Sequence, residues 1–160
     1  MSSFSGTQRP RVWRKLSVVL LALLVLGSGG EAGQDPPSRS EESEESRMWM
    51  TVGERRFAIT LTDTAAARAF AAQLPLTLDM SELNGNEKHA DLPKPLPVNA
   101  NRPGTIRNGD LMLYGADTLV VFYLTFQSSY SYTRLGQVDE PSDLPQALGP
   151  RGVRIRFSKD

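Results

Sequence analysis

The segment from Gly109 to Gly136, GDLMLYGADTLVVFYLTFQSSYSYTRLG, constrains the fold of this chain most. It is apolar and aromatic, it has the period-two pattern of strands, and turn-forming residues stand at positions 115–117. Branched and aromatic residues in such a pattern fit a pleated, half-buried sheet. We therefore predict a β-hairpin core, with one buried side formed by Leu111, Leu113, Leu119, Val121, Tyr123 and Phe126.

Further strand-like segments flank this hairpin on both sides. The patterns predict strands over residues 48–52, 56–61, 76–83, 110–114, 118–126, 128–133, 135–139 and 153–157. The alanine-rich residues 64–74 and the segment 143–148 are predicted as helices. Residues 84–104, which include four prolines, are predicted as a long irregular loop. Short connections between so many strands favour a mainly β fold, a closed eight-stranded barrel with two capping α-helices, because closure leaves no exposed strand edge.

The N-terminal residues have the pattern of a secretory leader. Four cations precede the apolar run Leu16–Leu26, and small residues follow it up to Ala32. The run is shorter than the ~20 residues of a comfortable membrane span. We therefore predict an exported protein with a signal peptide over residues 1–32, cleaved after Ala32 or, alternatively, after Gly29 or Gly30. An uncleaved signal anchor is the other interpretation, and the leader would then be the only contact with a membrane.

The next residues have the composition of a linker. Residues 33–47, GQDPPSRSEESEESR, are rich in Ser, Glu and Pro and contain no large apolar side chain. Such a segment buries too little apolar surface to offset the entropy lost on ordering. We predict a disordered linker over 33–47 and a single β-barrel domain over 48–160.

Composition excludes several functions. The chain has no cysteine, which excludes disulfides, thiol catalysis, cysteine-ligated metals and a cysteine-anchored lipoprotein. It carries 18 basic and 18 acidic residues, and removal of a 1–32 leader takes away four cations and one acid. The remaining 14 basic and 17 acidic residues give no reason to expect nucleic-acid binding, which needs a basic face.

The most polar candidate site lies in the predicted loop. Asn86, Glu87 and Lys88 offer donors, acceptors and charge to a ligand. The alternative is that Asn84-Gly85 forms a tight turn and that Glu87 and Lys88 are solvated.

An aromatic segment supplies the second candidate site. Tyr130, Tyr132 and Arg134 are spaced two apart, which would place them on one side of an extended segment. Two phenols and a guanidinium there would line a groove for a peptide or a sugar through stacking and cation–π contacts. The alternative is a structural role, in which the tyrosines anchor loops.

No residue pattern indicates a catalytic or metal centre. His89 is the only histidine, and its neighbours Glu87 and Asp91 lie too close together in the chain to supply the separated ligands of a stable metal site. No nucleophile-elbow motif surrounds Ser128, Ser129 or Ser131. We therefore assign no catalytic residue, no metal and no cofactor.

Three segments carry a resemblance to a known family: LPLTLDMSELNGNEKHADLPKPLP (74–97), PGTIRNGDLMLYGADTLVVFY (103–123) and SYSYTRLGQVD (131–139). Together they resemble the bacterial cyclophilin-like fold proteins, which are distinct from true cyclophilins. The resemblance implies a compact eight-stranded barrel with two helices and no settled function. The Phe-His-Arg triplet of true cyclophilins is absent here.

Three functions follow as hypotheses. The first is an exported, non-catalytic barrel that binds a peptide or small molecule on an aromatic-lined face. The second is a diverged peptidyl-prolyl isomerase, which requires Arg102, Arg107 or Arg134 beside an apolar pocket formed by residues such as Phe122, Phe126 or Met112. The third is a structural accessory domain, which predicts an exposed apolar patch and no concave site.

Overall fold

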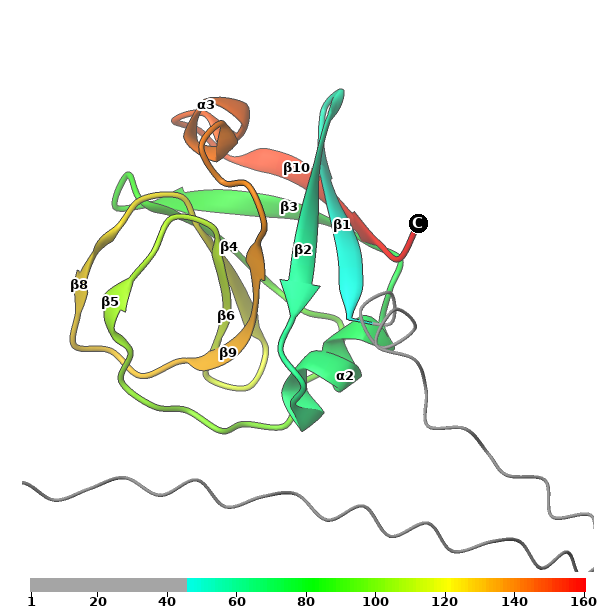
Figure 1. Cartoon of the computed structure of the whole chain (residues 1–160), viewed down its shortest axis with the longest axis vertical. Helices are drawn as coiled ribbons and strands as arrows, with labels where there is room; N and C mark the ends of the chain where they lie inside the picture. Colours follow the sequence, from blue (N-terminus) through cyan, green and yellow to red (C-terminus); the bar gives the residue numbers. More distant parts are fainter. Residues whose placement is uncertain (1–45) are drawn as a thin grey trace, which may run out of the picture. The chain divides into compact units, whose positions relative to one another are not determined.

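A computed structural model of the chain describes residues 46–160, and the predicted leader and most of the linker lie outside these residues (Figure 1). Eight antiparallel strands close a barrel in the order β1-β10-β3-β4-β7-β6-β9-β2. The strands are β1 (Arg47–Val52), β2 (Arg55–Leu61), β3 (Leu76–Leu83), β4 (Glu87–Asp91), β6 (Asp110–Tyr114), β7 (Thr118–Phe122), β9 (Thr133–Val138) and β10 (Val153–Ser158). The closed eight-stranded barrel predicted from the sequence is confirmed.

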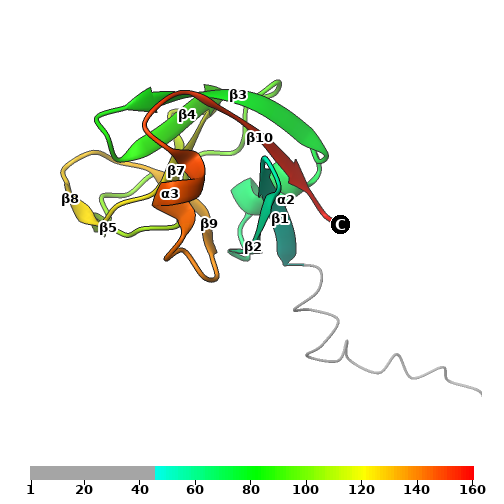
Figure 2. The same cartoon turned by 90° about the horizontal axis from the view of Figure 1, so that it is seen from above.

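Four smaller elements complete the described part of the chain. The strands β5 (Gly104–Ile106) and β8 (Phe126–Ser128) form a separate two-stranded sheet. It lies on the side of the barrel away from β1 and β2 (Figures 1 and 2). The helices α2 (Ala65–Ala71) and α3 (Leu144–Leu148) bury apolar side chains in the barrel core. No helix within residues 46–160 is long and apolar enough to span a membrane.

Three segments differ from their predicted structure. The predicted strand over 118–126 is divided between β7, which ends at Phe122, and β8, which begins at Phe126. The predicted loop 84–104 contains the strand β4, which pairs with both β3 and β7. This strand, EKHAD, has little apolar alternation, because its side chains make polar contacts on one side and line a hollow on the other. The predicted strand over 128–133 is absent: β8 ends at Ser128, and β9 begins at Thr133.

The central hairpin of β6 and β7 is apolar on both faces. Five of the six residues predicted on its buried side lie in the barrel core, namely Leu111, Leu113, Leu119, Val121 and Tyr123. The sixth, Phe126, packs instead in a second cluster outside the barrel. That cluster contains Met112, Val120 and Phe122 from the outer face of the hairpin, together with Ile106 of β5 and Tyr132. The sheet β5–β8 therefore covers the outer face of the hairpin, and both faces are buried.

A bulge interrupts the pairing of β6 with β9. Leu111 lies opposite Gly136, whereas Met112 lies opposite Arg134, so Leu135 is an extra residue in β9. The Leu135 side chain is fully buried in the barrel core. The bulge thus fills the core with Leu135 and disturbs the pairing next to Arg134.

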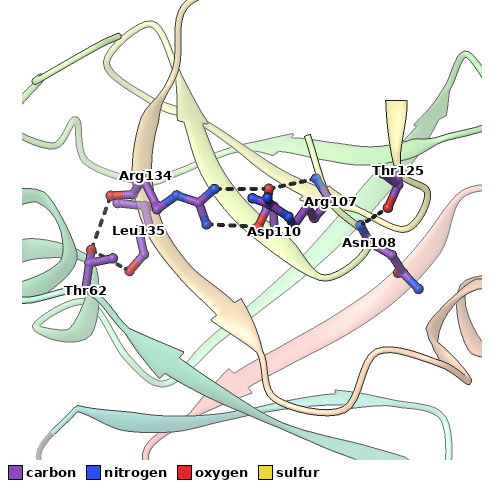
Figure 3. A network of polar contacts seen from close by, with 7 residues as sticks. All are labelled: Thr62, Arg107, Asn108, Asp110, Thr125, Arg134 and Leu135. Atoms are coloured by element: carbon purple, nitrogen blue, oxygen red, sulfur yellow. Dashed lines mark hydrogen bonds and ion pairs between the residues drawn. The ribbon is translucent and has the colours of Figure 1, made fainter. Parts of the chain in front are cut away.

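Polar contacts hold the bulge in place (Figure 3). Thr62 donates its backbone N–H to the Leu135 carbonyl at 2.9 Å, and its hydroxyl lies 3.1 Å from the same oxygen. The Arg134 guanidinium donates to both carboxylate oxygens of Asp110, at 2.9 and 3.2 Å. The fully buried Asp110 also accepts the backbone N–H of Arg107 at 2.9 Å. Arg134 is therefore the cation that neutralises a buried carboxylate.

We expect Arg134→Ala to lower the free energy of unfolding by about 3 kcal/mol, because it leaves a buried carboxylate without its cation. Arg154→Ala is the matched control. Arg154 also donates two hydrogen bonds to an aspartate, Asp79, but both of these side chains are exposed to solvent. Urea denaturation of both variants measures the difference. Equal losses in the two variants would contradict the role assigned to Arg134.

Candidate functional site

A concave pocket of about 410 Å³ opens on the outer side of the barrel. Its walls come from the β3–β4 turn, from β4, from the turn end of the β6–β7 hairpin and from the segment 126–132. In an antiparallel pair, directly opposed residues point to the same face. Glu87 is opposite Phe122 and His89 is opposite Val120, so both β4 side chains share the outer face with the second apolar cluster.

Aromatic rings in contact with one another run along this face. Tyr130 lies 6.4 Å from Tyr114, measured between ring centroids, and Tyr114 lies 5.7 Å from Tyr132. Phe122 follows at 5.4 Å from Tyr132, and Phe126 at 5.7 Å from Phe122. We call these five residues the aromatic row. All of them except Phe122 line the pocket, so the pocket presents aromatic surface to a ligand.

Exposed apolar side chains gather at the pocket. Five large ones are strongly exposed within residues 46–160: Leu83, Val98, Tyr114, Leu124 and Tyr130. Leu83, Tyr114 and Tyr130 line the pocket. Exposed apolar side chains that cluster in a concave site, with polar groups between them, are typical of a ligand-binding surface.

Glu87 is the buried charge of this pocket. The residue is only 8% exposed, and its carboxylate makes no hydrogen bond or ion pair with any residue that the structure describes. Three side chains within residues 46–160 have a polar atom that is sealed from solvent and makes no hydrogen bond. They are Gln73, Asn86 and Asn108. The Glu87 oxygens are not among them, so they keep access to the space of the pocket. The amide oxygen of Asn86, beside Glu87 in the pocket wall, lacks a donor.

The surroundings of Glu87 disfavour its charge. Burial, and after it the negative charge of Glu82, raise the pKa of Glu87 above its usual value of 4.5. The pKa of Tyr132 is raised as well, by burial first and then by the charge of Glu87. The other titratable groups of the pocket are His89, Tyr114 and Tyr130. The pocket therefore contains an acid but neither Lys nor Arg.

Lys88 lies on the opposite side of β4 from Glu87 and is fully buried. Its ammonium pairs with Glu82 and donates to the carbonyls of Gly149 and Arg151, both at 2.7 Å. The alternative that Glu87 and Lys88 are solvated loop residues is therefore wrong for both. The strand β4 turns Lys88 into the barrel and buries Glu87 in the pocket wall. Of the three loop candidates, Asn86 and Glu87 line the pocket and Lys88 does not.

The aromatic candidates are also divided. Tyr130 and Tyr132 both line the pocket, whereas Arg134 lies outside it. These three residues therefore do not line one groove together, because Arg134 is not part of the pocket wall. Residues 129–132 form no regular strand, and the bulge at Leu135 disturbs β9 next to Arg134.

The isomerase hypothesis requires an arginine beside an apolar pocket, and no arginine of residues 46–160 lines the aromatic pocket. Arg102 and Arg107 are exposed and do not line the aromatic pocket. Arg134 lines two other hollows, beside Thr62 and Pro97, outside the aromatic pocket. No group of three or more metal-ligating side chains in this part of the chain is placed to hold an ion.

Sequence reasoning missed several pocket residues. Tyr114, Val120 and Phe126 belong to segments predicted as core strands. The alternation along 110–114 does indicate that Tyr114 and Leu113 point to opposite faces. It does not indicate which polar residues from β4 meet Tyr114, because that depends on the pairing of β4 with β7.

Comparisons with known proteins identify the family. The sequence profile of the cyclophilin-like family matches residues 50–158, so the chain belongs to this family, as the resemblance predicted. Among solved structures, the chain is similar to a hypothetical protein from Archaeoglobus fulgidus, determined in solution. The two are 13% identical with a TM-score of 0.50, and the match covers 72% of this chain and 95% of the other. This likeness concerns the fold alone. A search of curated proteins gave no match.

We expect Glu87→Gln to stabilise the protein increasingly as pH rises. The raised pKa means that folding favours the protonated acid, so the wild type loses stability as pH rises from below 4.5 through the folded-state pKa. The glutamine variant has no such loss. The difference between their free energies of unfolding should be smallest at acid pH and should then increase to a plateau.

Urea denaturation across a pH series measures this difference. Glu54→Gln is the charge-matched control, because it removes an exposed carboxylate in the β1–β2 turn. A flat profile for Glu87→Gln would show that the carboxylate is solvated in solution, and a difference that falls as pH rises would show that it has a cationic partner.

Proposed function

We propose that this protein is an exported binding module that holds a peptide segment or a small molecule in the aromatic-lined pocket. The observation that carries the proposal is the convergence in one hollow of the aromatic row with a buried polar group, Glu87. A pocket of about 410 Å³ lies within the usual range of small-molecule sites, about 300–1,000 Å³. The fold itself supplies no argument for a function.

Binding is a better account of this site than catalysis. A nucleophile is activated by a second group held in hydrogen-bond reach. The carboxylate of Glu87 has no such partner within the described residues. The isomerase alternative is disfavoured further, because no arginine lines the pocket. The structural accessory role is disfavoured by the presence of a concave site.

Nuclear magnetic resonance with a library of small fragments and short peptides tests the binding proposal. We expect hits to shift the amide signals of pocket residues such as Thr118 and Val120. Ser129→Trp should weaken those hits at least tenfold, because Ser129 is exposed at the pocket wall and an indole there would occupy the hollow.

Ser142→Trp is the matched control. Ser142 is also exposed but lines a different hollow, between β1, β2 and the α3 segment. It should leave the hits unchanged. Hits that map to the Ser142 hollow and are lost in Ser142→Trp would contradict the proposal for the aromatic pocket.

Export rests on the leader pattern of residues 1–32. For the chain produced with its leader in a bacterial host, mass spectrometry should find an N-terminus at Gly33, or at Gly30 or Glu31 for the alternative cleavage sites. Leu20→Arg together with Leu24→Arg interrupts the apolar run and should abolish the processing. An intact leader on membrane-bound wild-type protein would support the signal anchor, and an intact leader on cytoplasmic protein would contradict export.

A further inference from the structure

The strongest unexplained feature of the described residues is that Glu87 has no partner. Three charged side chains are almost fully buried there: Glu87, Lys88 and Asp110. Lys88 has Glu82 and two carbonyl oxygens, and Asp110 has Arg134 and a backbone N–H. A buried charge without such partners is costly, and proteins normally pair it. Glu87 is the exception, and it is the charge that faces the pocket.

The other residues that line the pocket also favour a positively charged ligand group. Neither Lys nor Arg lines it, so a ligand cation would meet no fixed positive charge from these side chains. Tyr114 and Tyr130 are 49% and 63% exposed, and their rings stand nearly perpendicular to each other. Aromatic faces attract cations electrostatically, and the attraction is stronger where water is partly excluded.

We propose that the pocket recognises a protonated nitrogen group with N–H donors, an alkylammonium or guanidinium, at the Glu87 carboxylate. The inference rests on the proposed binding function and specifies its ligand. The N–H donors of the group bond the carboxylate, and the apolar stem lies along the aromatic row. A charge-assisted hydrogen bond of this kind is about twice as strong as one between neutral groups.

The physical reason for selectivity is the state of Glu87 in the complex. A neutral ligand that fills the pocket removes the remaining water from the carboxylate and leaves it without a partner. A cationic ligand replaces that water with an opposite charge. The ligand cation therefore restores the pairing that Lys88 and Asp110 obtain from the protein itself.

The test uses the full chain and two matched probes. Nα-acetyl-lysine methylamide and Nα-acetyl-norleucine methylamide differ at the end of the side chain, where lysine carries the ammonium. Titrations followed by nuclear magnetic resonance should give at least tenfold tighter binding of the lysine probe, with shifts at Thr118, Val120 and Tyr130. Glu87→Gln should abolish the preference, and the exposed control Glu54→Gln should keep it.

Variants of Tyr130 test the aromatic contribution. Tyr130→Phe keeps the ring and should keep most of the affinity for the lysine probe, whereas Tyr130→Ala should lose several-fold. Because Tyr130 is strongly exposed, both variants should fold.

A third probe, butylamine, distinguishes a free amine from a lysine side chain of a peptide as the natural ligand. Equal binding of butylamine and the lysine probe supports a free amine as ligand, and tighter binding of the lysine probe supports a peptide side chain.

Each contrary outcome has a distinct meaning. Equal binding of the lysine and norleucine probes in the pocket overturns the cation inference and leaves the proposed binding function intact. A lysine preference that survives in Glu87→Gln also overturns the inference, because the cation then binds elsewhere. The absence of pocket shifts with every probe, while fragments also fail to bind there, overturns the inference and the proposed function together.

Discussion

Burial of both faces of the β6–β7 hairpin is the constraint on which the described structure depends. One face fills the barrel with residues such as Leu111 and Val121, and the other carries Met112, Val120 and Phe122. A barrel strand with an apolar outer face needs a cover, because exposed apolar patches of that size are unfavourable in water. The sheet β5–β8 and Tyr132 provide that cover. The pocket lies where this cover meets β4, so it is a consequence of the same packing.

The two adjacent residues Glu87 and Lys88 show how a strand divides charge between environments. Side chains alternate along β4, so one residue points into the barrel and the next points out. Inside, the Lys88 ammonium is satisfied by Glu82 and by carbonyls of the segment that closes this end of the barrel. Outside, Glu87 has no hydrogen-bond or ion-pair partner among residues 46–160. The charge of Lys88 therefore contributes to the stability of the fold, and the charge of Glu87 is available to bind a ligand.

Membership of the cyclophilin-like family and the geometry of the pocket answer different questions. The family accounts for the barrel order and for the extent of the domain, since its profile covers residues 50–158. The ligand chemistry depends on side chains at one edge of the barrel. Arg134 illustrates the difference. In the sequence, a guanidinium near aromatic residues suggests a group that binds a ligand. In the structure, its hydrogen bonds to Asp110 give it a structural role (Figure 3).

The sequence by itself determined the mainly β class, the closed barrel, the two helices and most strand positions, because these depend on local periodicity and on residue propensity. It also pointed to Asn86, Glu87, Tyr130 and Tyr132, four residues that the structure brings into one pocket. Only the tertiary structure decided that β4 exists, since EKHAD becomes a strand through pairing with β3 and β7 rather than through its own pattern. That pairing set which face each charge of β4 occupies. Two cations then found partners that only the folded chain brings together: Lys88 pairs with Glu82 across the β3–β4 turn and with the distant Gly149, and Arg134 pairs with Asp110. Glu87 was left as the unpaired carboxylate.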